Sequence, residues 1–256
     1  MKKIIFSAIM ALMIVPNAFG WGSKGHDVVA YVAEQNLSRK VARKVTKALE
    51  GHSLVYYANW MDNASHTPEY AYTSTWHYAN VDEGYTYQTM PKNEKGDVVT
   101  AVNGLIAQLK SGTLSPEQES VALRMLIHLV GDMHCPMHAG HKSDLGGNMV
   151  EVIYFGKPSK LHSIWDSSLV ESAHNWGYTE WQYQIDRKPK TEDQKIQQGT
   201  PEEWFMETVE LCKGIYKDLP EGTKLSYDEV AKYAPMIEEQ LLKGGLRLAK
   251  ILEEIY

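Results

Sequence analysis

Histidine and aspartate recur in this chain at spacings that suit metal binding. The stretch "HLVGDMHCPMH", residues 128–138, places three histidines and an aspartate at the end of an apolar run. His128 and Asp132 are four residues apart, so on a helix they share one face. Burying a carboxylate and imidazoles costs free energy unless they are paired or bound to metal. This stretch alone leaves two interpretations open, a structural His–Asp pair or a metal site.

A second pair of the same kind lies in "LHSIWDSSL", where His162 and Asp166 are again four residues apart and flanked by apolar side chains. Two such pairs in apolar sequence favour metal binding over structural coincidence. Pro136 cannot continue the helix, so we expect the next donor, His138, just past its end. Further candidate donors stand earlier in the chain: His26, Asp62 in "NWMD" and His77 in "STWHYANVD".

The number of donors predicts more than one metal ion. The candidate ligands are His26, Asp62, His77, His128, Asp132, His138, His162 and Asp166. Zinc takes imidazole and carboxylate ligands, usually three or four from the protein. This set exceeds what one zinc ion can use, and a carboxylate can bridge two ions. Because neighbouring zinc ions are commonly used to hydrolyse phosphate esters, the set indicates an exported multinuclear zinc hydrolase acting on such esters.

Other chemically capable residues are expected to lie outside the metal ligands. His134 projects roughly 240° away from the His128–Asp132 face, so we expect it in the core or behind a ligand. Cys135 could bind metal, although a simply buried thiol is the favoured interpretation. Export would permit a disulfide, but the spacing does not say whether Cys135 and Cys212 pair. The remaining histidines are expected on the surface or in loops: His52, His66, His141 and His174.

The elements that must position these donors are mostly helical. Helices are expected near 25–36, 38–50, 97–111, 116–134, 161–174, 200–218 and 226–254. Ser115, with Pro116 and Gln118, gives the clearest helix start, a capping box with proline at the first helical position. The last helix is expected to bend or begin afresh at Pro235. Alternation in 146–156 predicts a short β-hairpin, and residues 51–96 have no clear assignment. We expect a mostly α, single-domain helical fold with that hairpin.

The first twenty residues read as a bacterial secretory signal. Lys2 and Lys3 precede an apolar run that ends in Ala18-Phe19-Gly20, and the run is too short to span a bilayer. We therefore expect a signal peptide at 1–20, a domain at 21–256 beginning with Trp21, and an exported product, periplasmic or secreted, without a membrane anchor. The oligomeric state is unknown from sequence.

The charge of the chain disfavours a basic nucleic-acid-binding module. The full chain has 26 basic and 32 acidic residues and a net charge of −6. Removal of Lys2 and Lys3 leaves 24 basic residues and a net charge of −8. A sequence-reading nucleic-acid binder usually carries a basic patch. A metal cluster could still create a local positive site on such an acidic protein.

Six motifs together resemble one family. They are "WGxxGH", "NWMD", "WHY", "HLVGDMHCPMH", "DLGGN" and "LHSIWD", in this order from Trp21 to Asp166. The set resembles the zinc-dependent single-strand-specific nucleases of fungi and plants, the S1/P1 nuclease family. The resemblance implies a mostly helical fold, like that of zinc phospholipase C, holding three zinc ions. "HLVGDMHCPMH" would contribute ligands to all three.

The resemblance also implies a ligand set and a mechanism. The first zinc would use Asp62, His77, His128 and Asp132. The second would use His138, His162 and Asp166. The third would use Asp132, His26 and the amino group and carbonyl of Trp21. A hydroxide held between two zincs would attack the phosphodiester of single-stranded DNA or RNA, and the third zinc would stabilise the departing 3′ oxygen. The products would carry 5′-phosphates, and 3′-nucleotidase activity is a further expectation.

The expected contacts with single-stranded nucleic acid or nucleotides come from three residues. Tyr78 would stack on an unpaired base, with simple packing as the alternative. Asn80 stands where fungal members carry a base-contacting aspartate, which leaves base preference open, and Asn148 of "DLGGN" is the third. Two other functions remain as alternatives. A bacterial zinc phospholipase C typically has Glu at the position of Asp166, and a non-catalytic zinc-binding protein would tend to carry His-rich tracts, which are absent.

Overall fold

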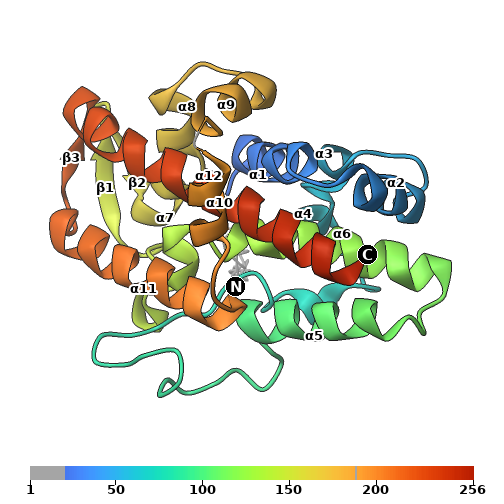
Figure 1. Ribbon diagram of the computed structural model, residues 1–256. Coiled ribbons are helices and arrows are strands. Elements are labelled where there is room, and N and C mark those ends of the chain that lie inside the picture. The colour runs from blue at the N-terminus through green and yellow to red at the C-terminus, as the bar shows by residue number, and fades with distance from the viewer. Residues whose placement is uncertain (1–20, 188) are drawn as a thin grey trace, which may run out of the picture.

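Helices make up most of the described chain, with a small sheet at one end (Figure 1). The computed structural model describes residues 21–187 and 189–256, so the expected signal peptide at 1–20 lies outside the described residues. The longer helices are α1 (Ser23–Gln35), α2 (Arg39–Ala48), α5 (Val98–Ser111), α6 (Pro116–Asp132), α11 (Pro201–Asp218) and α12 (Tyr227–Ile255). Within the described part, no helix is both long enough and apolar enough to cross a bilayer.

The shorter elements connect these helices. They are α3 (Leu54–Tyr57), α4 (Trp60–Ala64), α7 (Leu161–Ser163), α8 (Leu169–Ala173), α9 (Tyr178–Ile185), α10 (Lys190–Ile196), β1 (Glu151–Tyr154), β2 (Lys157–Lys160) and β3 (Lys224–Leu225). Helices α3 and α4 lie within 51–96, for which no assignment was possible from the sequence, and α9 and α10 were not expected. Each of these helices has eight residues or fewer, too short for a periodic apolar pattern to stand out.

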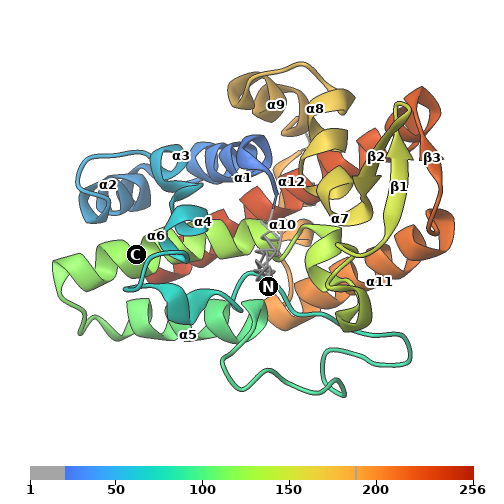
Figure 2. The same ribbon diagram turned by 180° about the vertical axis from the view of Figure 1, so that it is seen from behind.

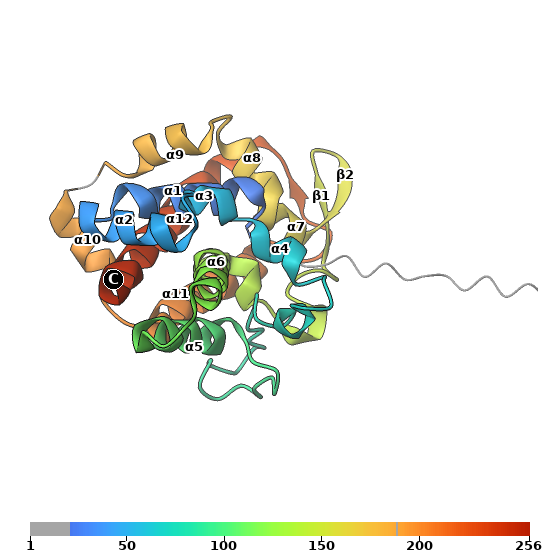
Figure 3. The same cartoon turned by 90° about the vertical axis from the view of Figure 1, so that its right-hand side faces the viewer.

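Helix α6 is the axis around which the other helices pack. It starts as expected, with Ser115 and Gln118 forming both halves of a capping box and Pro116 at the first position. From Ala122 to Asp132 nearly every residue is buried. Figure 3 looks almost along α6, which contacts α1 to α5 and α12. Because packing holds α6 on all sides, the last turn carries His128 and Asp132 into the interior at fixed positions.

Helix α12 runs without interruption through Pro235, so the expected fresh start there is wrong. A proline inside a helix removes one backbone hydrogen bond. The part of α12 beyond it packs closely on α1, where a Cβ added to Gly245 would stand only 2.4 Å from the Val32 side chain. The apolar surface buried in that contact outweighs the missing hydrogen bond.

The sheet and the helix before it also differ from expectation. The hairpin lies at 151–160 rather than within 146–156, because its two-residue turn is made by Phe155 and Gly156, both with positive φ. The two-residue strand β3 adds a parallel pairing to β1, giving the order β2-β1-β3 (Figure 2). The single helix expected at 161–174 is instead α7, a π-helical turn at Ile164–Ser168 and α8.

A buried arginine ties the end of α6 to α11 and α12. Arg247 is 2% exposed and donates two hydrogen bonds to the Glu207 carboxylate, at 2.7 and 2.8 Å, and one to the Ile196 carbonyl. A further N–H donates to Nε2 of His134 at 3.0 Å, while Nδ1 of His134 donates to the Val130 carbonyl. Burial, and then Arg247, lowers the pKa of His134 to about 3. His134 is therefore a neutral core residue, as expected.

Replacing Arg247 by alanine should lower the free energy of unfolding by about 3 kcal/mol, because His134 Nε2 and the Ile196 carbonyl lose their donor. Urea denaturation measures the change. The control is Lys232→Ala, which breaks the exposed ion pair with Asp218 and should leave stability unchanged within error. Equal stability of the Arg247→Ala protein and the control would contradict this role for Arg247.

Candidate metal centre

Four imidazoles surround the carboxylate of Asp132, which is fully buried at the end of α6. Oδ1 lies 3.3 Å from His26 Nε2 and 3.8 Å from His138 Nδ1. Oδ2 lies 2.9 Å from His77 Nδ1 and 3.3 Å from His128 Nε2. The histidines come from α1, the loop before α5, α6 itself and the 3₁₀ turn Pro136–Ala139. The two oxygens thus face different sets of ring nitrogens, which is the geometry of a carboxylate that bridges two sites.

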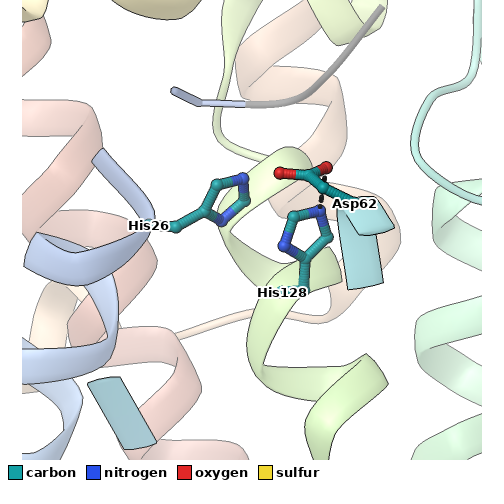
Figure 4. A group of neighbouring side chains, drawn as sticks. All are labelled: His26, Asp62 and His128. Carbon is teal, nitrogen blue, oxygen red and sulfur yellow. Dashed lines mark ion pairs between the residues drawn. The ribbon is translucent and has the colours of Figure 1, made fainter. Parts of the chain in front are cut away.

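Two groups of donors meet at His128. In one, His26, Asp62 and His128 come together from α1, α4 and α6 (Figure 4), with Asp62 Oδ1 3.1 Å from His128 Nε2. In the other, His77 and Asp132 join His128. Within each group the donor atoms all lie within 4.8 Å of one another. The rings of His26 and His128 are stacked, with centroids 3.9 Å apart, so each fixes the orientation of the other.

Backbone carbonyls orient three of the histidines. Nδ1 of His128, His138 and His162 donates to the carbonyls of Ala58, His77 and Gly146, respectively. This is how proteins usually fix a metal-binding imidazole, because it leaves Nε2 unprotonated and aimed at the site. His134 makes the same kind of Nδ1 bond, but its Nε2 faces the Arg247 guanidinium, which excludes a cation there.

Several polar atoms of the centre are buried without a hydrogen-bond partner among the residues that the structure describes. They are Nδ1 and Nε2 of His26, Oδ1 of Asp62, Nε2 of His77 and Oδ1 of Asp132. An unsatisfied buried polar atom costs about 1–3 kcal/mol. Metal ions bound among these atoms would satisfy most of them and would lie among the nitrogen and oxygen donors that zinc prefers. The residues present therefore fit a metal centre.

The charges of the centre are strongly coupled. Burial alone would raise the pKa of the Asp132 carboxyl, but His128 and His138 hold it well below its usual range. Burial alone would lower the pKa of His128, but Asp132 and Asp62 raise it well above its usual range. The charged forms of His128 and these carboxylates therefore stabilise one another. A bound metal ion would take over that positive charge and displace the imidazole proton.

A third group forms around Asp166. Its Oδ2 lies 3.2 Å from His162 Nε2, and its Oδ1 lies 3.9 Å from His138 Nε2 and 3.5 Å from the sulfur of Cys135. The π-helical turn keeps His162 and Asp166 on one side, and such turns are frequent at functional sites. From the sequence, Cys135 was expected to be a simply buried thiol. In the structure it shares this group with His138 and Asp166. The Cys-x-x-His spacing of Cys135 and His138 is the sequence feature that could have indicated this proximity.

Close backbone approaches hold the beginning of the described chain against the centre. The Gly22 amide donates to the Asp166 carbonyl at 2.6 Å, and the neighbouring Trp21 side chain is fully buried. A Cβ on Gly25 would stand 2.6 Å from that of Trp21, and one on Gly131 would stand 2.8 Å from His26 Nδ1. Trp21 is thus placed beside the donor group around Asp166. Its coordination through the amino group remains a prediction.

The three expected substrate contacts lie close in sequence to His77 or in the loop around Gly146. Tyr78 and Asn80 are half-buried, and the Asn80 carboxamide packs near Gly146. Asn148 is also half-buried and donates to the Leu145 carbonyl at 2.9 Å. Leu145 and the two glycines after it all have positive φ, which strains Leu145 and turns the loop sharply. That nucleic acid contacts these three residues remains a prediction.

The four histidines that were expected outside the metal centre do not belong to it. His52, His66, His141 and His174 join none of the three donor groups found among the described residues. Both cysteines are buried and free, so the structure contains no Cys135–Cys212 disulfide between these described positions.

A methyl group added at Gly131 should displace His26, because His26 is buried and stacked on His128. We expect Gly131→Ala to keep its helix content, bind less metal after dialysis and lose roughly 10- to 100-fold in kcat/KM. The control is Gly104→Ala, also within a helix but with no atom within 4 Å of the added carbon. Full metal content in Gly131→Ala would show that His26 tolerates the shift and is not held as described.

Comparisons with known proteins agree with the donor groups. The family model described as S1/P1 Nuclease matches residues 21–256. Endonuclease 2 of Arabidopsis thaliana is 30% identical over 280 residues, covering 97% of this chain and 94% of the relative. Nuclease S1 of Aspergillus oryzae is 25% identical over 289 residues, with coverage of 100% and 98%. Nuclease P1 of Penicillium citrinum is 26% identical over 280 residues, with coverage of 92% and 98%.

These matches favour a nuclease, which hydrolyses phosphodiester bonds, over the phospholipase C alternative. The match runs over the whole described chain, including every element that brings a donor to the three groups. The chain belongs to the S1/P1 nuclease family.

Proposed function

We propose that this protein is an exported, zinc-dependent endonuclease that cleaves single-stranded DNA and RNA to 5′-phosphorylated products and also acts as a 3′-nucleotidase. The observation that carries the proposal is the ring of four buried imidazoles around the Asp132 carboxylate. Burying so many titratable side chains together costs free energy unless they are paired or bind metal. Nuclease family membership names the reaction for which such a centre is suited.

Two of the three donor groups support a three-zinc assignment, whereas the remaining group joins His26 to ligands assigned to the first zinc. We assign the first zinc to Asp62, His77, His128 and Asp132. We assign the second to His138, His162 and Asp166. We assign the third to Asp132, His26 and the amino group and carbonyl of Trp21. Asp132 serves two of the three, in keeping with its two oxygens facing different histidines. The third assignment requires that the leader be removed after Gly20.

With zinc bound, the buried donors of the chain would hold a strongly positive site for the substrate. Bound zinc ions supply Lewis-acid chemistry, lowering the pKa of water toward neutrality and neutralising phosphate charge. Three zinc ions bring +6, whereas Asp62, Asp132 and Asp166 bring −3. The centre is therefore about +3 within a chain of net charge −6, so a phosphodiester is drawn to the centre itself. The backbone carbonyls behind the histidines hold the ligands rigid, so little reorganisation is needed during reaction.

Selection of single strands follows from the aromatic neighbour of a metal ligand. Tyr78 directly follows His77 and is partly exposed. A base that stacks on Tyr78 must be unpaired, and this places its phosphate near the metal centre. Asn80 and Asn148 present carboxamides, which can both donate and accept hydrogen bonds. A carboxamide at Asn80 therefore suits a broader range of bases than an aspartate would.

The protein beginning at Trp21 should contain about three zinc ions per chain. Chelator should abolish activity and lower the melting temperature by about 10 °C or more, because the buried carboxylates lose their counter-charges. Elemental analysis and calorimetry measure both effects, and added zinc should reverse them. Active protein with one zinc or none would contradict the three-ion centre.

A chain that keeps Gly20 before Trp21 should lose the third zinc. Its Trp21 nitrogen is then a planar amide with a delocalised lone pair, whereas a free α-amine has a pKa near 8 that zinc can displace. At equal zinc concentration we expect about one fewer ion per chain and a fall in kcat/KM of roughly tenfold or more. Equal zinc content and equal activity in the two proteins would remove the amino terminus from the site.

Substitution of Tyr78 by alanine should raise KM for a single-stranded oligonucleotide by roughly fivefold or more, with a smaller change in kcat, because stacking contributes about 1–3 kcal/mol per base. Steady-state kinetics separate the two constants. Tyr183→Ala, which removes an exposed aromatic ring of α9, is the control and should change neither constant. An unchanged KM would make Tyr78 a packing residue.

A further inference from the structure

Cys135 stands where a metal ligand would stand. It is fully buried and caps the 3₁₀ turn Pro136–Ala139. The His138 amide donates to the Cys135 carbonyl, which closes that turn. Residues three apart in 3₁₀ geometry lie on the same side. The turn therefore brings the thiol and the His138 ring to one face, as the Cys-x₂-ligand spacing of zinc sites does.

Two distances from Asp166 match those expected between ligands of one zinc ion. With zinc–sulfur and zinc–oxygen bonds of about 2.3 and 2.0 Å, tetrahedral sulfur and oxygen ligands lie roughly 3.5 Å apart, and nitrogen and oxygen ligands roughly 3.3 Å apart. The sulfur of Cys135 is 3.5 Å from Asp166 Oδ1, and His162 Nε2 is 3.2 Å from Oδ2. His138 Nε2, at 3.9 Å from Oδ1, needs only a small shift.

We propose that Cys135 is a sulfur ligand of the zinc ion held by His138, His162 and Asp166. This inference rests on the proposed zinc-dependent function. Without metal the thiol donates a hydrogen bond to Asp166 Oδ1. On metal binding the S–H bond breaks, a sulfur–zinc bond forms and the proton leaves to solvent, so the charge of the group falls by one.

A sulfur ligand would give this ion a different character from the two ions at Asp132, whose assigned ligands are all nitrogen and oxygen. Sulfur and nitrogen are the usual donors of structural zinc sites, so the ion would be held more tightly. The +3 charge of the centre becomes about +2, since the thiolate adds one negative charge.

The second cysteine is a built-in control. Cys212 lies on α11, is also almost fully buried and belongs to none of the three donor groups of the described chain. The Cys212→Ser protein therefore keeps one thiol, that of Cys135. A thiolate signal in that protein belongs to Cys135 without any change at the metal centre.

Cobalt(II) spectroscopy tests the proposal. Metal-free protein beginning at Trp21 is loaded with cobalt as the unchanged chain, as Cys212→Ser and as Cys135→Ser. Visible bands report cobalt bound by nitrogen and oxygen, and a near-ultraviolet charge-transfer band reports a cobalt–thiolate bond. We expect both signals in the unchanged chain and in Cys212→Ser. Cys135→Ser should lose the near-ultraviolet band and bind one of its zinc ions at least roughly tenfold less tightly.

The possible results distinguish failure of the proposed sulfur ligand from failure of the proposed zinc-dependent function. Visible bands without the near-ultraviolet band in Cys212→Ser would overturn the sulfur ligand and leave the zinc centre standing. No cobalt binding at all in the unchanged chain would overturn the proposed zinc-dependent function. A Cys135→Ser protein that fails to fold does not affect the result, because Cys212→Ser alone assigns the band.

Discussion

A carboxylate buried away from water must be surrounded by positive charge, and the structure is organised around that requirement at Asp132. Its two oxygens face His26 and His138 on one side and His77 and His128 on the other. Because these histidines come from distant parts of the chain, one side chain at the end of α6 determines where four segments must meet. The candidate metal centre is therefore part of the interior of the fold.

The rest of the fold keeps these groups from relaxing. Carbonyls of Ala58, His77 and Gly146 fix the rings of three histidines. Gly131 leaves the space that His26 occupies, and Arg247 anchors His134 just beyond the end of α6. Strain remains at the loop around Leu145, which lies beside the expected substrate contacts. Such strain is typical where the surrounding packing holds a functional loop in one conformation.

The sequence predicted the parts that depend on local rules. The four-residue spacing of His128 and Asp132 placed both on one helix face, and the capping box at Ser115 set where α6 begins. It did not predict α3, whose first amide, that of Leu54, is satisfied by the distant Glu34 carboxylate. It also missed β3 and left open whether α12 continues through Pro235, since both depend on packing between segments far apart in sequence. The distance from Cys135 to Asp166 could not be predicted, because it exists only in the folded chain.

We propose that Asp132 is shared between two metal ions. Anomalous diffraction at the zinc edge, from crystals of zinc-loaded protein that begins at Trp21, locates these ions. We expect one anomalous peak beside each oxygen of Asp132, one toward His77 and His128 and the other toward His26, with a further peak between His138, His162 and Asp166. A single peak near Asp132, or none, would contradict it.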